Sequence, residues 1–395
     1  MTAVTQLYLP TTVEKLKCPW EWGKVAIDVA QENQHYFSDG YGLYEKQEDG
    51  YALVAVRAED QRVRYTVASN TTVIEQHAFE GQMYIQEVEL PEGVISIEKE
   101  AFESCQALRR IVLPEGLTRI CADAFRCCIS LEGLELPSTL KNLGEHAVTD
   151  TYGWSPSMNG IMYMRVHPDN PYFYHDANAF YQRRENGSLL IKYFGKNEVW
   201  KIPEEVTELG AMALRRSNLR EVIIPETVKS ISKDAFAECG RLECMEFAAD
   251  GVKLYVPENP VYRKGEISSL FYRDNAGQLH YDYETYDSLL ADWSQILIRC
   301  RMAAFRLEYP VQLPTARKQA YEALIAEHLK DLVYDICKRD SLMDLAALGN
   351  AGMITAEHIE EMIDWTTACR RGKLTGYLLE YQQEHFTENT FDFSL

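Results

Sequence analysis

The sequence lacks any long hydrophobic run, and this absence bears first on membranes. No stretch of about 18 consecutive apolar residues occurs in the chain, so a transmembrane helix is not expected. Its first residues, MTAVTQLYLPTTVEKLK, show no basic segment followed by an apolar one, which argues against a signal peptide. We therefore expect a cytoplasmic protein with no membrane partner.

Positive charge is also scarce. Lys and Arg number 40 against 60 Asp and Glu, which gives a formal net charge of −20 over 395 residues. Affinity for nucleic acid depends on Lys and Arg that neutralise phosphates, so no nucleic-acid partner is expected. With 46% hydrophobic and 25% charged residues, the composition is that of a folded chain and excludes a disordered or fibrous one.

Familiar catalytic and metal-binding motifs are missing as well. The sequence has no phosphate-binding glycine loop, dinucleotide fingerprint, HExxH, GxSxG or EF-hand loop. It has no CxxC pair of the kind that holds zinc. The ten cysteines are expected to be reduced thiols, because the chain is long and shows no export signal. We predict no enzyme activity, no catalytic residue, no cofactor and no bound metal.

The chain does contain a repeat. Ala78, Ala101, Ala124 and Ala147 stand 23 residues apart, the first three followed by Phe, and Ala213 and Ala235 resume the series with a step of 22. Between them runs a second pattern, LxxIxLP, as in LRRIVLP from Leu108 to Pro114. Several anchor positions hold this phase, so a structural repeat is predicted.

One unit of this repeat is too small to fold alone. The alternating part of LxxIxLP is typical of a short, half-buried strand, and the proline ends it because it cannot donate a ladder hydrogen bond. Stacked units can bury the apolar faces that one unit leaves exposed, which predicts a solenoid. Stacking also places Cys105, Cys128 and Cys239 at one equivalent position, where we expect a ladder of buried thiols.

The pattern IxxxAFxxCxxLxxIxLP resembles the bacterial leucine-rich repeats called BspA-like, over about residues 74–247. That resemblance implies a curved solenoid with strands on its concave face, used mainly to bind proteins. It specifies the type of repeat and no particular ligand.

Two stretches that interrupt the 23-residue period resemble one another. Asn33 matches Asn170, and without a gap Asp39 then falls on Asp176 and Gly50 on Gly187. Aromatic strand-like segments on either side of each glycine predict hairpins. We predict hairpin-bearing units near residues 25–67 and 162–202, with a looser third unit near residues 254–283.

From about residue 285 the apolar spacing becomes helical. Leu289, Leu290, Trp293, Ile296, Leu297 and Cys300 form one amphipathic stripe, and similar stripes follow to about residue 381. The predicted fold is an α/β repeat: a β-rich leucine-rich-repeat solenoid over residues 1–283, followed by an all-α helical-hairpin domain over residues 284–395 that shields the last repeat.

Protein–protein recognition is the function that this fold favours. If the LxxIxLP strands line a concave face, the side chains between their apolar positions form a largely acidic row that suits a basic or mixed protein partner. The candidate binding residues are Glu87, Glu89, Arg110, Val112, Glu135, Glu221, Ile223 and Glu246.

Two other functions stay open. Some BspA-like relatives are surface adhesins, so binding of host proteins at the cell surface is one alternative, although the missing signal peptide counts against it. The other is a metal-dependent enzyme built on His167, Asp169, His175 and Asp176 in the second hairpin unit. The first hairpin unit has Ser38 where the second has His175, so the unit itself does not require this cluster.

Overall fold

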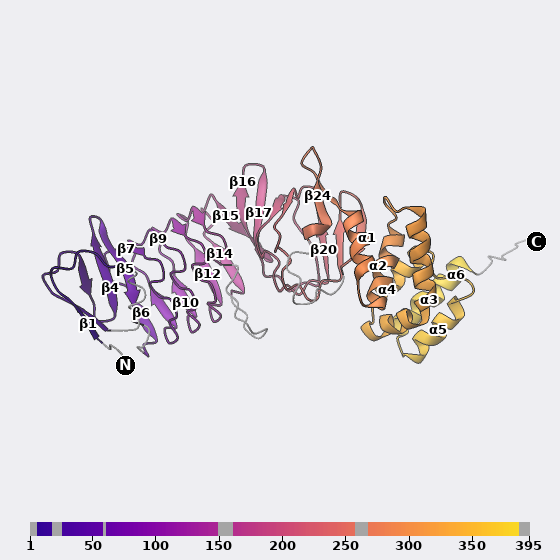
Figure 1. Ribbon diagram of the computed structural model, residues 1–395, viewed down its shortest axis with the longest axis horizontal. Helices are drawn as coiled ribbons and strands as arrows, with labels where there is room; N and C mark the ends of the chain where they lie inside the picture. The colour runs from indigo at the N-terminus through magenta and orange to yellow at the C-terminus, as the bar shows by residue number, and fades with distance from the viewer. Residues whose placement is uncertain (1–5, 18–25, 58–60, 149–160, 257–267, 387–395) are drawn as a thin grey trace, which may run out of the picture. The chain divides into compact units, whose positions relative to one another are not determined.

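The computed structural model describes residues 6–17, 26–57, 61–148, 161–256 and 268–386. It divides into a first unit (Met1–Lys196, Glu205–Ser217 and Ser230–Ala237) and a second unit (Asn197–Glu204, Asn218–Lys229 and Glu238–Leu395). The repeats fold as a β-solenoid and the C-terminal region is helical, which confirms the predicted fold class (Figure 1).

Each repeat of the first unit contributes one strand from its LxxIxLP segment, and these strands pair in parallel. The strands are β1 (Gln6–Leu9) with β2 (Ala26–Val29), β6 (Arg64–Thr66) with β8 (Glu87–Glu89) and β10 (Arg110–Val112), and β12 (Gly133–Leu136) with β14 (Tyr163–Val166). Residues one coil apart stand opposite each other, as Glu87 does with Arg110. The intervening Val88, Ile111 and Leu134 point into the core, where they are buried.

A second set of strands from the same coils builds two further sheets, which continue into the hairpins. The first sheet contains β3 (Tyr36–Ser38), β4 (Gly42–Gln47), β5 (Gly50–Val56), β7 (Thr71–Ile74), β9 (Ser96–Ile97), β11 (Arg119–Ile120) and β13 (Asn142–Leu143). The second contains β15 (Phe173–His175), β16 (Ala179–Arg184), β17 (Gly187–Tyr193), β19 (Val206–Leu209) and β21 (Ser230–Ile231). Within both hairpins the pairing is antiparallel, and the last hairpin strand then pairs in parallel with the next coil.

The Ala-Phe dipeptides form a corner of each coil. The Phe79 amide donates to the carbonyl of Ala101, one coil later, at 2.7 Å, and Phe102 donates to Ala124 in the same way at 2.9 Å. Their rings stack with centroids 4.6 Å apart, and the Phe125 ring continues the column 5.2 Å from Phe102. The small alanine leaves room for the neighbouring backbone, and the phenylalanine fills the inside of the corner.

The two hairpins confirm the internal alignment, because matched asparagines make matched bonds. The Asn170 amide donates to the carbonyls of Pro137 and Leu140 at 2.8 and 3.1 Å, and its oxygen accepts the Tyr172 and Phe173 amides. Asn33 makes the equivalent four bonds in the first hairpin. A third hairpin is present as β24 (Phe271–Arg273) and β25 (Leu279–Tyr281), while residues 257–267 of that predicted unit lie outside the described residues.

The second unit holds the last coils and the helices. Its four-stranded sheet contains β18 (Val199–Lys201), β20 (Glu221–Ile224), β22 (Cys244–Phe247) and β23 (Val252–Tyr255). A short 3-10 turn, η2 (Ser268–Leu270), precedes β24. The helices are α1 (Tyr283–Asp292), α2 (Ile296–Glu308), α3 (Thr315–Arg339), α4 (Leu342–Asn350), α5 (Ile359–Ala368) and α6 (Gly372–His385). Among the described residues, none of the helices combines the length and the apolar character that a membrane span requires.

The sequence predicted that the stripe from Leu289 to Cys300 lies on one helix, and this prediction was wrong. Trp293 and Gln295 have extended backbones, so α1 ends before them and α2 begins after them. Apolar spacing alone does not reveal such a break, because each of the two helices keeps its own share of the stripe.

The helices cover the last strand of the solenoid within the second unit. The Tyr286 hydroxyl of α1 donates to the Tyr255 carbonyl at the end of β23, at 2.7 Å. The Phe305 ring of α2 lies 5.8 Å from the Tyr255 ring. In this unit, the helical region therefore shields the final coil.

Candidate functional site

Five strands of the first unit, from the sheets β6-β8-β10 and β12-β14, carry outward-facing side chains. We call the outward side chains of β6, β8, β10, β12 and β14 the strand face. Five of the eight predicted binding residues lie on it: Glu87, Glu89, Arg110, Val112 and Glu135. The other three, Glu221, Ile223 and Glu246, lie on β20 and β22 of the second unit and are half-buried. The predicted row is thus divided between the two units.

The acidic residues of the strand face have basic or hydroxyl partners on neighbouring strands. Arg64 lies 2.5 Å from Glu87, and Arg165 lies 3.4 Å from Glu135. The Thr66 hydroxyl donates to Glu89 at 3.0 Å. Cross-strand pairs of opposite charge stabilise a sheet modestly, and here they also balance its surface charge. The strand face is therefore mixed in charge, because two arginines outside the predicted row offset two of its glutamates.

In the second unit, a lysine offsets the negative charge of two acidic residues of the predicted row. Lys253 Nζ lies 2.5 Å from Glu221 and 3.7 Å from Glu246. Burial opposes the charge of Lys253, but the hydrogen bond to Glu221 and the neighbouring carboxylates outweigh burial and raise the pKa of its amine. Lys253 is consequently charged at neutral pH and neutralises part of the acidic row.

A groove of about 710 Å³ opens on the strand face across β10, β12 and β14. Its lining includes Arg110, Val112, Glu135, Tyr163 and Arg165. The Val112 and Tyr163 side chains keep 51% and 42% of their surface exposed, although both are largely apolar. The groove therefore combines accessible apolar surface with guanidinium and carboxylate groups.

A glycine shapes the floor of this groove. Gly133 occupies the position that Arg110 fills on β10, and the Tyr163 ring of β14 lies across it. A Cβ atom at residue 133 would fall 2.2 Å from the ring, so any larger residue would push the tyrosine away. The Arg165 guanidinium then lies 5.4 Å from the centroid of the same ring, within cation–π range.

Sequence reasoning missed Arg64, Gly133, Tyr163 and Arg165. A signal for the last two existed, because Ile161, Met164 and Val166 keep the LxxIxL spacing, although the proline comes one residue late. β6 has no proline at its end, so the motif did not mark it.

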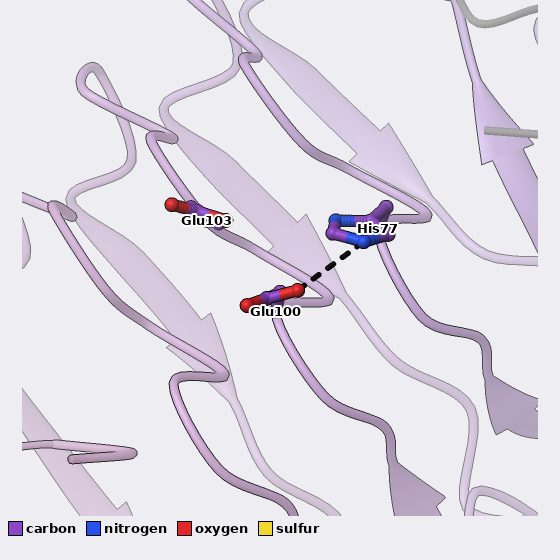
Figure 2. Close-up of side chains that lie close together, drawn as sticks. All are labelled: His77, Glu100 and Glu103. Atoms are coloured by element: carbon purple, nitrogen blue, oxygen red, sulfur yellow. Dashed lines mark ion pairs between the residues drawn. The ribbon is translucent and has the colours of Figure 1, made fainter. Parts of the chain in front are cut away.

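The predicted His/Asp cluster does not converge on a common point. Both carboxylate oxygens of Asp176 are used in the hairpin: one accepts the Asn178 and Ala179 amides and the other accepts the Tyr181 hydroxyl. His175 Nδ1 accepts the Val166 amide at 3.2 Å, and exposed His167 lies 3.9 Å from Asp169. In the described part of the chain, three ligand atoms gather only at His77, Glu100 and Glu103 (Figure 2).

Cys127 and Cys128 are adjacent in the sequence and lie at the Ala-Phe corner that contains Phe125. Burial raises the pKa of the Cys128 thiol, whose sulfur donates to the Phe102 carbonyl at 3.1 Å. Cys127 is half-buried, with a left-handed backbone at φ 57°. A thiol whose pKa is raised holds little reactive thiolate, so Cys128 is unsuited to nucleophilic chemistry.

A comparison with known protein families finds a match for the repeats of the solenoid. The family model described as a BspA type leucine rich repeat region matches residues 63–154 and 192–257, in six copies. Residues 63–154 and 192–257 are thus similar to the BspA-type leucine-rich repeats. Residues 63–154 include most of the strand face, so β6, β8, β10 and β12 are BspA-type strands. Leucine-rich repeat proteins are generally non-catalytic binding modules, and solenoids of this kind offer extended surfaces for protein partners.

Several solved structures of bacterial leucine-rich repeat proteins are similar to this chain. The pneumococcal vaccine antigen PcpA shares 16% identity over 53% of this chain and 69% of its own, with a TM-score of 0.37. A leucine-rich repeat protein from Eubacterium ventriosum shares 15% identity over 54% and 71%, with a TM-score of 0.38. Another from Bacteroides capillosus shares 22% identity over 34% and 99%, with a TM-score of 0.29. No curated protein matches the sequence.

Proposed function

We propose that the protein is a non-catalytic recognition module that binds a protein partner on its strand face, across the groove of β10, β12 and β14. The observation that carries this proposal is the groove itself, which is lined by exposed Val112 on β10 and by exposed Tyr163 and Arg165 on β14. Arginine and tyrosine are among the residues that most often dominate binding energy at protein interfaces. Removing the exposed apolar surface of this groove from water would contribute to affinity.

The mixed charge of the strand face favours a partner that is itself mixed. Glu135 and Arg165 are both largely exposed and lie at the rim of the same groove. A partner with a carboxylate near Arg110 and an amine near Glu135 would complement the charges of these two residues. A partner with charges of one sign only would place like charges together at one of them. The eight-residue row remains part of this proposal, with its second-unit members as further candidates.

A matched pair of substitutions tests the proposal. Val112 is 51% exposed on β10, and Ile95 is 50% exposed beside β9, on the other sheet of the same unit. The full chain is used to capture proteins from a lysate of its source, and each captured protein is then purified and titrated. Val112→Asp is expected to weaken binding at least tenfold, which corresponds to about 1.4 kcal/mol, because a carboxylate would replace apolar contact in the groove.

The control is Ile95→Asp, which adds the same charge with the same exposure and should leave the dissociation constant unchanged. Glu135→Lys, which reverses one charge of the predicted row, should also weaken binding. Equal affinities for the Val112→Asp, Ile95→Asp and unsubstituted proteins would contradict the proposed face.

A further inference from the structure

Repeat stacking brings a histidine against a glutamate at the first Ala-Phe corner. His77 precedes Ala78, and Glu100 precedes Ala101 at the equivalent place one coil later. His77 Nε2 lies 3.2 Å from Glu100 Oε2, as Figure 2 shows. Glu103, from the same corner as Glu100, completes a group whose ligand atoms all lie within 4.8 Å of one another.

The spacing suits a transition metal ion. Two ligands about 2.0–2.1 Å from a tetrahedral zinc ion lie about 3.3 Å apart, close to the separation of His77 Nε2 and Glu100 Oε2. Glu103 offers a carboxylate oxygen within 4.8 Å of the ligand atoms of His77 and Glu100. The Gln76 amide lies 3.1 Å from the same histidine nitrogen, and a bound ion would displace it.

Each of the three side chains is also held from behind. Glu80 Oε2 lies 2.9 Å from His77 Nδ1, the nitrogen that faces away from Glu100. Lys99 lies 3.3 Å from Glu100 Oε1, and Arg126 lies 3.2 Å from Glu103 Oε1. Metal-binding histidines almost always donate their second nitrogen to a carboxylate or carbonyl, and ligating carboxylates are likewise held by outer partners.

The carboxylates gather in a partly enclosed place. The side chains of His77 and Glu100 are each 15% exposed, and that of Glu103 is 19% exposed. Glu80 Oε2, Glu100 Oε2 and Glu103 bring three carboxylates to the surroundings of one imidazole at this corner. A divalent cation would be attracted by this gathering of negative charge.

We propose that His77, Glu100 and Glu103 form a site for a divalent transition metal ion, with zinc as the best match, and that the ion ties two successive coils together. An imidazole nitrogen with two carboxylate oxygens suits zinc, whereas magnesium and calcium prefer oxygen ligands alone. Three protein ligands leave a position open for water or for a group from another molecule. Glu80 is a positioning residue that orients the imidazole.

Zinc binding to the full, reduced, metal-stripped chain tests this site. The unsubstituted protein is expected to bind one more zinc ion per chain in equilibrium dialysis than His77→Asn does, and asparagine keeps the left-handed backbone that residue 77 requires. Zinc should also raise the melting temperature of the unsubstituted protein and not that of His77→Asn. Glu80→Gln should weaken zinc binding by about 10- to 100-fold, the usual cost of losing such a partner.

His146→Asn is the matched control. His146 precedes Ala147 at the same corner position two coils beyond Glu100 and has the same left-handed backbone, but in the described chain it belongs to no three-ligand group. This variant should bind zinc as the unsubstituted protein does, whether the cysteines bind additional zinc or not. Glu100→Gln serves as a second ligand variant if circular dichroism shows that His77→Asn does not fold. Equal zinc content and equal affinity in the unsubstituted protein and a folded ligand variant would overturn the proposal.

Discussion

At the scale of single residues, the solenoid depends on backbone conformations that most residues avoid. The residue before each corner alanine is left-handed in four successive coils: His77, Glu100, Asp123 and His146. A second left-handed position follows three residues after the alanine, at Gly81, Ser104 and Cys127. Left-handed backbone costs an ordinary residue about 1–2 kcal/mol, so these corners are maintained by the packing and hydrogen bonds of the stacked coils.

Gly81 allows this cost to be measured. Its φ is +71°, and no atom lies within 4 Å of the place where a Cβ would stand, so Gly81→Ala would meet no steric clash. We expect Gly81→Ala to lower the free energy of unfolding by about 1 kcal/mol, as measured by urea denaturation. Ser104→Gly, the opposite change at the equivalent position of the next coil, should not destabilise the protein and should raise its stability slightly. A stabilising Gly81→Ala would contradict this account.

The buried asparagines are a second case in which one residue determines local structure. Asn170 is 3% exposed and satisfies two carbonyls of the preceding coil and two amides of its own turn. An amide is the side chain that can both donate twice and accept twice at one place. Asn33 and Asn170 therefore fix how each hairpin leaves the solenoid, which explains why the two sequences align there.

Substitution of Asn170 should be costly in a graded way. Asn170→Ala leaves four buried backbone groups without partners and is expected to lower the free energy of unfolding by about 3 kcal/mol or more. Asn170→Asp keeps the two acceptor bonds but loses both donors, so it too should destabilise the protein at neutral pH. Asn142→Ala, at an exposed asparagine on β13, should change stability by less than about 0.5 kcal/mol. Comparable losses for the Asn170→Ala and Asn142→Ala variants, measured by chemical denaturation, would show that this network matters little.

At the scale of whole elements, buried charges join the helices to one another and to the last coil. Asp287 of α1 accepts from Arg306 of α2 and from Arg317 and Tyr321 of α3, at 3.0–3.1 Å. Arg306 is fully buried and also donates to the Tyr309 and Val311 carbonyls. A buried ion pair is destabilising if one partner is lost, so this network specifies how the first three helices pack.

A second buried acid lies where α4 meets the last coil. Asp344 is 3% exposed, and its amide donates to Ser341, the N-cap of α4. The charged groups that face it are Arg301 of α2, Arg339 of α3 and Glu243 of the last coil, and Arg220 of the preceding coil lies near enough to interact with it. Burial raises the pKa of Asp344 to about 6, against the opposing effect of Arg301.

This carboxyl group gives the protein a defined pH dependence. Its pKa is higher in the folded chain than in the unfolded one, so the folded state binds the proton more tightly and the stability contribution is lost as pH rises through about 6. Between pH 5.5 and 7.5 the loss should be about 1 kcal/mol. The Asp344→Asn variant has no carboxyl group at this position and therefore lacks this pH dependence. The unfolding free energy of the variant minus that of the unsubstituted protein should therefore increase with pH over that window. A pH-independent difference would contradict the raised pKa.

The order and type of most elements could be predicted from particular residues, whereas breaks and caps could not. Leu108, Ile111 and Leu113 mark β10 because alternation and proline leave few other conformations. The extended Trp293 between α1 and α2 carries no comparable mark. Gly349 lies inside α4, whereas Gly352, with φ +72°, supplies the left-handed turn after the helix. Both glycines fit the composition of a helix end, and only tertiary packing distinguishes them.

At the scale of the whole molecule, the strand face could be foreseen but its charge could not. Glu87 and Glu135 belong to repeats with an intact motif, whereas Arg64 and Arg165, which neutralise them, lie on strands whose motif is incomplete. The corner site was missed for a different reason. His77 and Glu100 look unrelated along the chain, and they become neighbours only when the sequence is read at one position of successive coils.

The register of the corners limits how such a chain can change in length. The Phe79 amide donates to the Ala101 carbonyl, and the Phe102 amide donates to the Ala124 carbonyl, because both of these coils are 23 residues long. A deletion or insertion of a few residues between them would misalign the rings, thiols and carbonyls of both neighbours at once. Growth by duplication of an entire coil preserves all of these alignments, so the gene can be expected to gain or lose this region in multiples of one repeat.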